Sequence, residues 1–204
     1  MPIAAALIEP LYAYFRLLAH WNSRINLTSL RLDSPSDEAL ERLFLEPLAA
    51  AKHTPAVPAW WLDIGSGGGS PAIPLKVAQP GLRLTMVESR SRKAAFLREV
   101  VRELDLADAD VFCGRFDDLA ANPEGQHAAN LLTTRAVRTD SSFFIAASLM
   151  LRPSGELLVF RSAAEPVINS NRFNLGKPTI LGISGQTRLD HYRHRSMFHV
   201  EQSS

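Results

Sequence analysis

The residues best suited to chemistry lie in one short segment, where an apolar run ends in an acid and is followed by glycines. The segment is Trp60-Trp61-Leu62-Asp63-Ile64-Gly65-Ser66-Gly67-Gly68-Gly69-Ser70-Pro71. Because glycine lacks Cβ, Gly65, Gly67 and Gly69 permit positive φ and let a ligand approach the backbone. Pro71 suits the first turn of a helix. The pattern predicts a buried strand, a ligand-binding loop and a helix; the alternative is a glycine-rich turn that binds nothing.

A second acid narrows the class of ligand. Residues 82–88 alternate apolar and polar side chains as a strand does, and Glu88 lies twenty-five positions after Asp63. An acid at the end of the second strand can accept both ribose hydroxyls of an adenosine-type ligand. Asp63 would repel a phosphate and attract a cation, which favours S-adenosylmethionine, with its positive amino and sulfonium groups, over a dinucleotide. The alternatives are a solvated charge at Glu88 and a nicotinamide-dependent Rossmann enzyme, for which no catalytic acid–base pair is evident.

Composition limits the class of protein further. The 204 residues are 46% hydrophobic, which suits one domain with a good core. A net charge of +1 does not indicate nucleic acid, so RNA would be bound by local clusters. Cys113 is the only cysteine, which excludes an internal disulfide and fits a reducing compartment. No apolar run nears about eighteen residues, and the first residues lack the basic flank of a signal peptide. We expect a cytoplasmic monomer that contacts no membrane.

The first part of the chain predicts helices. A first helix opens at Pro10, and its apolar face carries Leu11, Phe15 and Leu18. Residues 21–29 form a loop whose asparagines cap helices, or in which Asn26 and Thr28 touch a substrate. The run Ser-Pro-Ser-Asp-Glu at 34–38 starts a second helix with an N-cap, a proline at the first position and acids in the first turn. Pro47 kinks or restarts that helix.

The remainder alternates helices and strands. We predict helices at 72–78, 91–104 and 143–151, strands at 109–112, 130–133, 157–160 and 179–183, and a turn at 152–155. Such alternation implies a parallel sheet covered on both faces. Ligands bind at the carboxyl ends of these strands, where Asp63, Glu88 and Arg135 would gather.

Two basic segments are candidates for contact with RNA. The outer face of the helix at 91–104 carries Arg92 and Lys93, although interleaved Glu99 and Glu103 also suit an ordinary solvated face. The tail at 191–199 is rich in histidine and arginine. No cysteine or acid completes a zinc site there, so we expect no metal and prefer a polar tail that approaches RNA phosphates.

Taken together, these motifs resemble the bacterial small-subunit rRNA guanine-N7 methyltransferase family, also known as the glucose-inhibited division protein B family. The resemblance runs from about Trp21 to Arg161. It is carried by Trp21-Asn22, Asn26-Leu27-Thr28-Ser29, Asp63 to Gly69, Pro71, Pro74-Leu75, Glu88-Ser89, Arg92-Lys93, Phe96-Leu97, Arg115 and Thr134-Arg135-Ala136.

The resemblance implies a class I methyltransferase fold, Rossmann-like and α/β. It implies a seven-stranded sheet whose last strand is antiparallel, in a methyltransferase domain at 57–204, and a helical extension at 1–56. It implies methyl transfer from S-adenosylmethionine to N7 of guanine 527 of 16S rRNA in the small ribosomal subunit. The expected cofactor-binding residues are Asp63, Gly65, Ser66, Gly67, Gly69, Pro71, Glu88, Ser89, Arg115, Phe116 and Arg135. The expected RNA contacts are Asn26, Thr28, Arg42, Arg92, Lys93 and Arg161.

Arg135 is the expected catalytic residue. It lies at the end of a strand, and arginine is the usual partner of the O6/N7 edge of guanine. A structural ion pair with Asp63 or Glu88 is the alternative.

Several positions depart from the family pattern. Leu43 replaces a histidine, Glu46-Pro47 an Asp-Ser pair, Asn130 an aspartate and Arg161-Ser162 a Lys-Gly pair. The changes at Asn130 and Arg161 leave open a non-catalytic module that binds S-adenosylmethionine and RNA.

Overall fold

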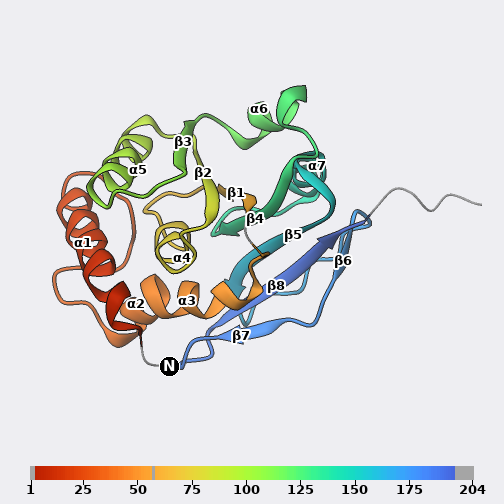
Figure 1. Cartoon of the computed structure of the whole chain (residues 1–204). Helices are drawn as coiled ribbons and strands as arrows, with labels where there is room; N and C mark the ends of the chain where they lie inside the picture. Colours follow the sequence, from red (N-terminus) through yellow and green to blue (C-terminus); the bar gives the residue numbers. More distant parts are fainter. Residues whose placement is uncertain (1–2, 57, 196–204) are drawn as a thin grey trace, which may run out of the picture.

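One twisted sheet organises the protein, and the computed structural model describes residues 3–56 and 58–195. The strand order is β3-β2-β1-β4-β5-β8-β6, with β7 also paired to β8 (Figure 1). The strands are β1 (Ala59–Ile64), β2 (Leu82–Glu88), β3 (Ala109–Cys113), β4 (Ala129–Arg135), β5 (Leu151–Ser162), β6 (Phe173–Leu175), β7 (Thr179–Leu181) and β8 (Thr187–His194).

The first five strands are parallel and β8 runs antiparallel to β5. The chain moves outward from β1 to β3 and then returns to β4 on the other side of β1, which makes β1/β4 the switch point where α/β proteins bind ligands. We predicted seven strands and find eight in the described residues. The difference lies at one edge, where β6 pairs with residues 192–194 of β8 and β7 pairs with residues 187–189. The two short strands together fill the seventh position.

Helices cover both faces of the sheet. They are α1 (Ala5–Asn22), α2 (Asp37–Leu40), the π-helix η1 (Glu41–Leu45), α3 (Glu46–Ala50), the 3-10 helix η2 (Ala51–His53), α4 (Ala72–Ala78), α5 (Ser91–Glu103), α6 (Phe116–Ala121), the 3-10 helix η3 (Pro123–Gly125) and α7 (Ser141–Met150). Trp61 packs into the core beneath α1, α4 and α5, and the next residue, Leu62, into the core beneath α6 and α7. This follows from the period of two along a strand, and it explains why β1 is apolar throughout.

Two predicted helix starts are wrong. The first helix begins at Ala5, with Pro10 inside it. Alanine favours helix strongly, and one missing N–H from the proline does not outweigh the buried face that continues through Tyr14 and Leu18. The second helix is capped by Ser36, whose side chain accepts from Ala39 N at 3.2 Å, so Pro35 lies before the helix. The prediction for Pro47 is confirmed, since a π-helix ends there and α3 restarts.

Two predictions after α7 are also wrong. Residues 152–155 belong to β5 and do not form a separate turn. The strand bends there, with a shift in its register against β4 and a φ of 62° at Ser154. The tail is a strand up to His194, because Tyr192 is fully buried against Phe144 and Phe173. His199 lies outside the described residues.

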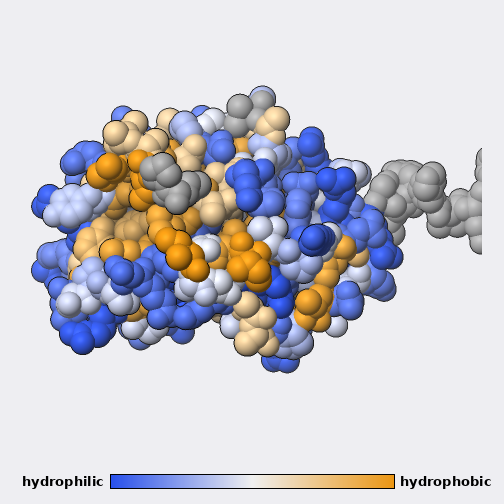
Figure 2. Space-filling model, turned by 90° about the horizontal axis from the view of Figure 1, so that it is seen from below, coloured by the Kyte–Doolittle hydropathy of each residue, from blue (hydrophilic) through white to orange (hydrophobic). Residues whose placement is uncertain are grey.

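An apolar area appears among polar surroundings on the face that carries α1–α3 and β7 (Figure 2). The exposed large hydrophobic side chains of these elements are Ile8 and Tyr12 of α1 and Ile180 of β7. Among residues 3–56 and 58–195, no helix is both long and apolar enough to cross a membrane.

Candidate functional site

The loop after β1 has the conformation that its glycines suggested. Gly65, Gly67 and Gly69 have φ of 71°, 53° and 90°, a region that side chains disfavour. A Cβ on Gly65 would meet Val137 Cγ2 at 2.5 Å, and one on Gly69 would meet Ile73 Cγ1 at 2.9 Å. The loop therefore requires glycine for close packing as well as for its turns.

Glu88 holds this loop in place. Its Oε2 accepts from Gly67 N at 2.9 Å and its Oε1 accepts from Arg90 N at 2.8 Å. Gly65 N also donates to Val87 O at 2.9 Å. The side chain is buried but lines a cavity. Because a carboxylate offers about four acceptor positions, Glu88 retains capacity for ligand hydroxyls after binding both amides.

Two cavities meet at Gly65. The loop cavity, of about 400 Å³, is lined by Ser66, Gly67, Glu88, Arg135 and neighbouring residues. The second, the Phe116 cavity, measures about 340 Å³ and is lined by Ser89, Arg115, Phe116 and neighbouring residues. Gly65 lines both. Seven other expected cofactor residues thus surround one glycine at the carboxyl ends of β1, β2, β3 and β4.

Three expected cofactor residues lie beneath this surface. Asp63, Gly69 and Pro71 are buried and line neither cavity. Pro71 is the N-cap residue of α4, and Gly69 O accepts from Ile73 N at 2.6 Å. Gly69 and Pro71 therefore support the loop from below.

Asp63 is a buried acid with incomplete hydrogen bonding. It is 1% exposed, and its Oδ1 accepts from Thr133 Oγ1 at 2.5 Å. Within the described part of the chain, its Oδ2 has no hydrogen-bond partner. Burial raises the pKa of Asp63 to about 6, against the opposing hydrogen bond from Thr133. The carboxyl is thus ionised at neutral pH and places negative charge beneath the loop.

Arg135 does form an ion pair, but with neither predicted acid. Its Nη2 donates to Glu46 Oε2 at 2.7 Å and its Nη1 to Arg42 O at 2.6 Å. The guanidinium lies over Phe160, 4.5 Å from the ring centroid. Burial lowers its pKa to about 10, with Glu46 opposing. The partner, Glu46, belongs to the helical segment and precedes Arg135 by 89 residues. The pattern of charged residues at the strand ends could not predict this contact.

Sequence reasoning also missed Tyr14. This fully buried side chain donates from its hydroxyl to Gly68 O at 2.6 Å, and burial raises its pKa. Only weak features of the sequence indicated Tyr14 and Glu46 as candidates. Tyr14 is a tyrosine on the apolar face of the first helix, and Glu46 is an acid in an otherwise apolar run. Tyr14 joins α1 to the ligand loop, and Glu46 joins α3 to the end of β4.

The loop after α1 is organised by Asn22. Its Oδ1 accepts from Leu27 N at 2.9 Å and from Thr28 N at 3.0 Å. Thr28 lines the loop cavity, and exposed Asn26 lines a neighbouring groove. Asn22 thus shapes the backbone of the loop, whereas Asn26 faces solvent.

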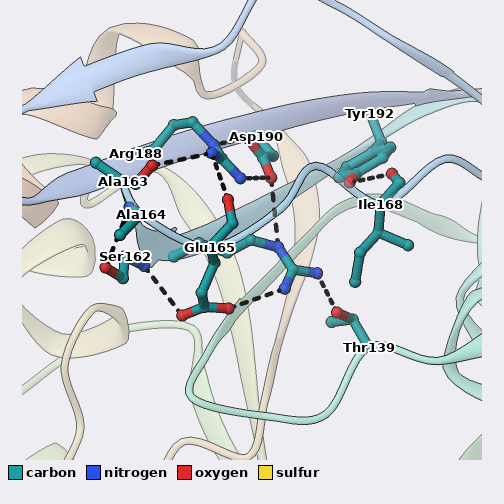
Figure 3. A network of polar contacts seen from close by, with 10 residues as sticks. Thr139, Ser162, Ala163, Ala164, Glu165, Ile168, Arg188, Asp190 and Tyr192 are labelled. Carbon is teal, nitrogen blue, oxygen red and sulfur yellow. Dashed lines mark hydrogen bonds and ion pairs between the residues drawn. The ribbon is translucent and has the colours of Figure 1, made fainter.

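The cations expected to contact RNA differ in their partners, although Arg42 and Arg161 both line a further cavity beside Arg135. Arg42 and Lys93 line the loop cavity, and Arg92 lies beside Lys93 in the neighbouring groove. Arg161 is instead held in an ion cluster with Asp190 and Glu165, which are labelled in Figure 3. It pairs with Asp190 and Glu165 at 3.3 Å each and donates to Thr139, with its side chain 8% exposed. This placement provides a structural role for Arg161.

No three side chains of His, Cys, Asp or Glu in residues 3–56 and 58–195 come together as a metal site. The geometry instead offers a glycine-lined cradle, a partly engaged carboxylate and a buried acid.

Solved structures establish the class of this fold. A crystal structure of a SAM-dependent methyltransferase from Aquifex aeolicus superposes with a TM-score of 0.62 at 14% identity, covering 78% of this chain and 94% of that one. A variant of MtNAS in complex with S-adenosylmethionine superposes with a TM-score of 0.63 at 13% identity, covering 93% of this chain and 73% of that one. The protein has the class I, Rossmann-like methyltransferase fold, as predicted.

The chain belongs to the GidB family, described as rRNA small subunit methyltransferase G, whose model matches residues 7–175. The protein named ribosomal RNA small subunit methyltransferase G of Stenotrophomonas maltophilia (strain K279a) is 40% identical over 163 residues, 79% of this chain and 72% of that protein. The protein of the same name from Roseiflexus sp. (strain RS-1) is 38% identical over 130 residues, 64% of this chain and 54% of that protein. The chain thus matches about half the length of the Roseiflexus relative. The resemblance seen in the sequence is confirmed.

Proposed function

We propose that this protein transfers the methyl group of S-adenosylmethionine to N7 of guanine 527 of 16S rRNA in the small ribosomal subunit. The observation that carries the proposal is the position of Glu88, which lies at the end of β2 and lines the loop cavity, beside the Phe116 cavity that meets it at Gly65. The family and the methyltransferase fold support the same reaction.

The residues around Gly65 suit S-adenosylmethionine. Glu88 has acceptor capacity for ribose hydroxyls, and Ser89, Arg115 and Phe116 line the cavity on the adenine side. The backbone at 65–67 faces the methionine end. The negative charge and unpartnered Oδ2 of Asp63 lie under that end and favour a cation above.

The proposed reaction requires positioning but no general base. Guanine N7 carries a free lone pair, which forms the new N–C bond while the C–S bond breaks and its electron pair stays on sulfur. S-adenosylmethionine supplies the methyl group and a good leaving group. No proton moves, so the task of the protein is to hold N7, methyl carbon and sulfur in line.

Arg135 is the residue that we assign to holding the guanine. It lines the loop cavity, and two of its five N–H groups are used by Glu46 and Arg42 O. The remaining donors suffice for the O6/N7 edge. Glu46 and the Phe160 ring orient the guanidinium, so the ion pair and the catalytic role are compatible.

The departures behind the non-catalytic alternative have structural explanations. Asn130 lies at the start of β4 and its Oδ1 accepts from Trp60 N at 2.9 Å, away from the carboxyl ends of the strands. Arg161 is held by Asp190, Glu165 and Thr139. Neither residue is required for the reaction as proposed.

The test uses small subunits that lack the modification and S-adenosylmethionine with a labelled methyl group. We expect label in 16S rRNA, and chain cleavage at guanine 527 after borohydride and aniline, because a cationic N7-methylguanine has a weakened imidazole ring. Label without that cleavage would place the methyl group on another atom. Cofactor binding without label would favour the non-catalytic module.

A separate arm tests the cofactor site by calorimetry. Glu88→Ala removes an acceptor for the ribose and for the loop, so binding of S-adenosylmethionine should weaken by roughly 1.5–3 kcal/mol per charged hydrogen bond at most. Exposed Glu103→Ala, at the end of α5, is the matched control. Unchanged affinity in the Glu88 variant would remove this residue from the site.

A further inference from the structure

A basic groove adjoins the loop cavity. Its walls are the loop after α1 and the start of α5, and its volume is about 630 Å³. It is lined by Arg24, Asn26, Arg90, Arg92 and Lys93, among others. Arg90 and Lys93 line the loop cavity as well, so the groove and the cavity are continuous.

The groove is strongly positive. No acid lines it. Glu88 lines the loop cavity, where its two oxygens accept from the backbone amides of Gly67 and Arg90. Among described residues, no carboxylate oxygen lies within 4.0 Å of the charged side-chain nitrogens of Arg24, Arg90, Arg92 or Lys93. Four cations without counter-ions at one place attract a polyanion.

The two walls are fixed to each other before any ligand binds. Two residues of α5, Glu99 and Phe96, contact Trp21. Trp21 Nε1 donates to Glu99 Oε1 at 3.2 Å, and the centroid of the Trp21 ring lies 5.9 Å from that of the Phe96 ring. Asn22 holds the backbone of the loop through Leu27 and Thr28. Such preorganisation reduces the ordering entropy that binding would otherwise cost.

We propose that the basic groove holds the ribose–phosphate backbone of the RNA strand next to the guanine in the loop cavity. This inference rests on the proposed function, because it assumes that a nucleotide enters that cavity. The groove contacts phosphates and so sets the register of the strand without reading its bases. Arg24 and Arg92, which line the groove but not the loop cavity, are its distinguishing residues.

The test measures binding of an RNA stem-loop with the sequence around guanine 527 as a function of salt. The variant is Arg24→Gln with Arg92→Gln. For single strands, log affinity falls with log salt by about 0.7 per phosphate neutralised. Loss of two contacts should therefore reduce the slope by about 1.4. Between about 50 and 200 mM salt, the wild type should lose about sevenfold more affinity than the variant.

Exposed Arg152→Gln with Lys177→Gln is the matched control, since neither side chain lines the cavity or the groove. The control should keep the wild-type slope, and both double variants should keep the wild-type melting temperature and cofactor affinity. An unchanged slope in the groove variant, or equal losses in both variants, would overturn the proposal. So would weaker binding to intact subunits with unchanged binding to RNA, because the groove would then contact a ribosomal protein.

The two proposals fail in different ways. If the wild type methylates guanine 527 and the groove variant keeps the wild-type salt slope, the groove proposal is wrong and the proposed function is supported. If the groove variant shows the reduced salt slope and the wild type transfers no methyl group to that guanine, the groove proposal is supported and the proposed function is wrong.

Discussion

Two buried aspartates in the same sheet have opposite surroundings. Asp190 in β8 is fully buried, and its oxygens lie 2.6 Å from Arg188 Nε and 3.3 Å from Arg161 Nε (Figure 3). Asp63 in β1 is 1% exposed, but it has one hydrogen bond from Thr133 and a second oxygen without a partner in the described residues. Asp190 is paired with arginines at close range, whereas Asp63 has no salt bridge in the described part of the chain and receives only the longer-range attraction of Arg135.

The cations follow the same division. Arg161 and Arg188 are committed to Asp190 and Glu165, and this cluster ties the segment after β5 to β8. Apart from Arg135, the arginine and lysine side chains around the loop cavity and the basic groove have no acid within 4.0 Å of their charged nitrogens among residues 3–56 and 58–195. A compensated cluster is expected to stabilise the fold, whereas uncompensated charge of both signs near one cavity is expected at a binding site.

The largest effect is expected when the compensated cluster is broken. Asp190→Ala leaves two largely buried arginines without their carboxylate, which costs about 3–5 kcal/mol of unfolding free energy. Urea unfolding followed by circular dichroism measures this. Asp33→Ala, in an exposed pair with Arg31, should leave the unfolding free energy close to that of the wild type, because water screens the pair. Similar values for the two variants would contradict the contrast.

Asp63 should affect stability through pH. Its pKa rises from 3.8 in the unfolded chain to about 6 in the fold, so folding takes up a proton between these values. The stabilisation is complete below pH 4 and is lost as pH rises through 6, by about 3 kcal/mol in total. In Asp63→Asn this dependence should be absent, and urea midpoints of both proteins at pH 4 and pH 7 isolate it. Parallel pH profiles would show that Asp63 ionises normally.

Arg135→Lys should separate orientation from charge. Lysine keeps the charge and contacts Glu46 but lacks the planar pair of donors. We expect kcat/KM for methyl transfer to fall by roughly 5- to 150-fold, which corresponds to a loss of about 1–3 kcal/mol in transition-state stabilisation, with cofactor affinity unchanged. If cofactor affinity and melting temperature fell together with turnover, Arg135 would be a structural residue only.

The smallest effect on stability should come from Arg42, an exposed cation that lines the loop cavity without an acid partner among described residues. Arg42→Gln should alter unfolding free energy by about 0.5 kcal/mol or less, while the salt dependence of RNA binding falls by about 0.7 in slope. The backbone oxygen that accepts from Arg135 is retained. A stability loss as large as that of Asp190→Ala would show that Arg42 stabilises the fold in the way that the paired arginines do.

Local patterns were sufficient for most of the sheet and for the position of the ligand loop. A continuous apolar run predicted β1, a period-two alternation predicted β2, and the predicted helix at 72–78 matches α4 in both bounds. The glycine spacing predicted positive φ at Gly65, Gly67 and Gly69. Alanine-rich residues before Pro10, and the bend at 152–155, were misassigned because proline and glycine signal turns only where tertiary packing does not override them.

The sequence by itself determined the fold class, the glycine loop and the two acids at the strand ends, because backbone conformation and strand period are local properties. Tertiary structure alone decided which charges are compensated. Glu46 reaches Arg135 across 89 residues, Asp190 reaches Arg161 from an antiparallel strand, and Tyr14 reaches Gly68 from the first helix. Ion pairs and burial depend on contacts between distant segments, and no local pattern in the chain specifies them.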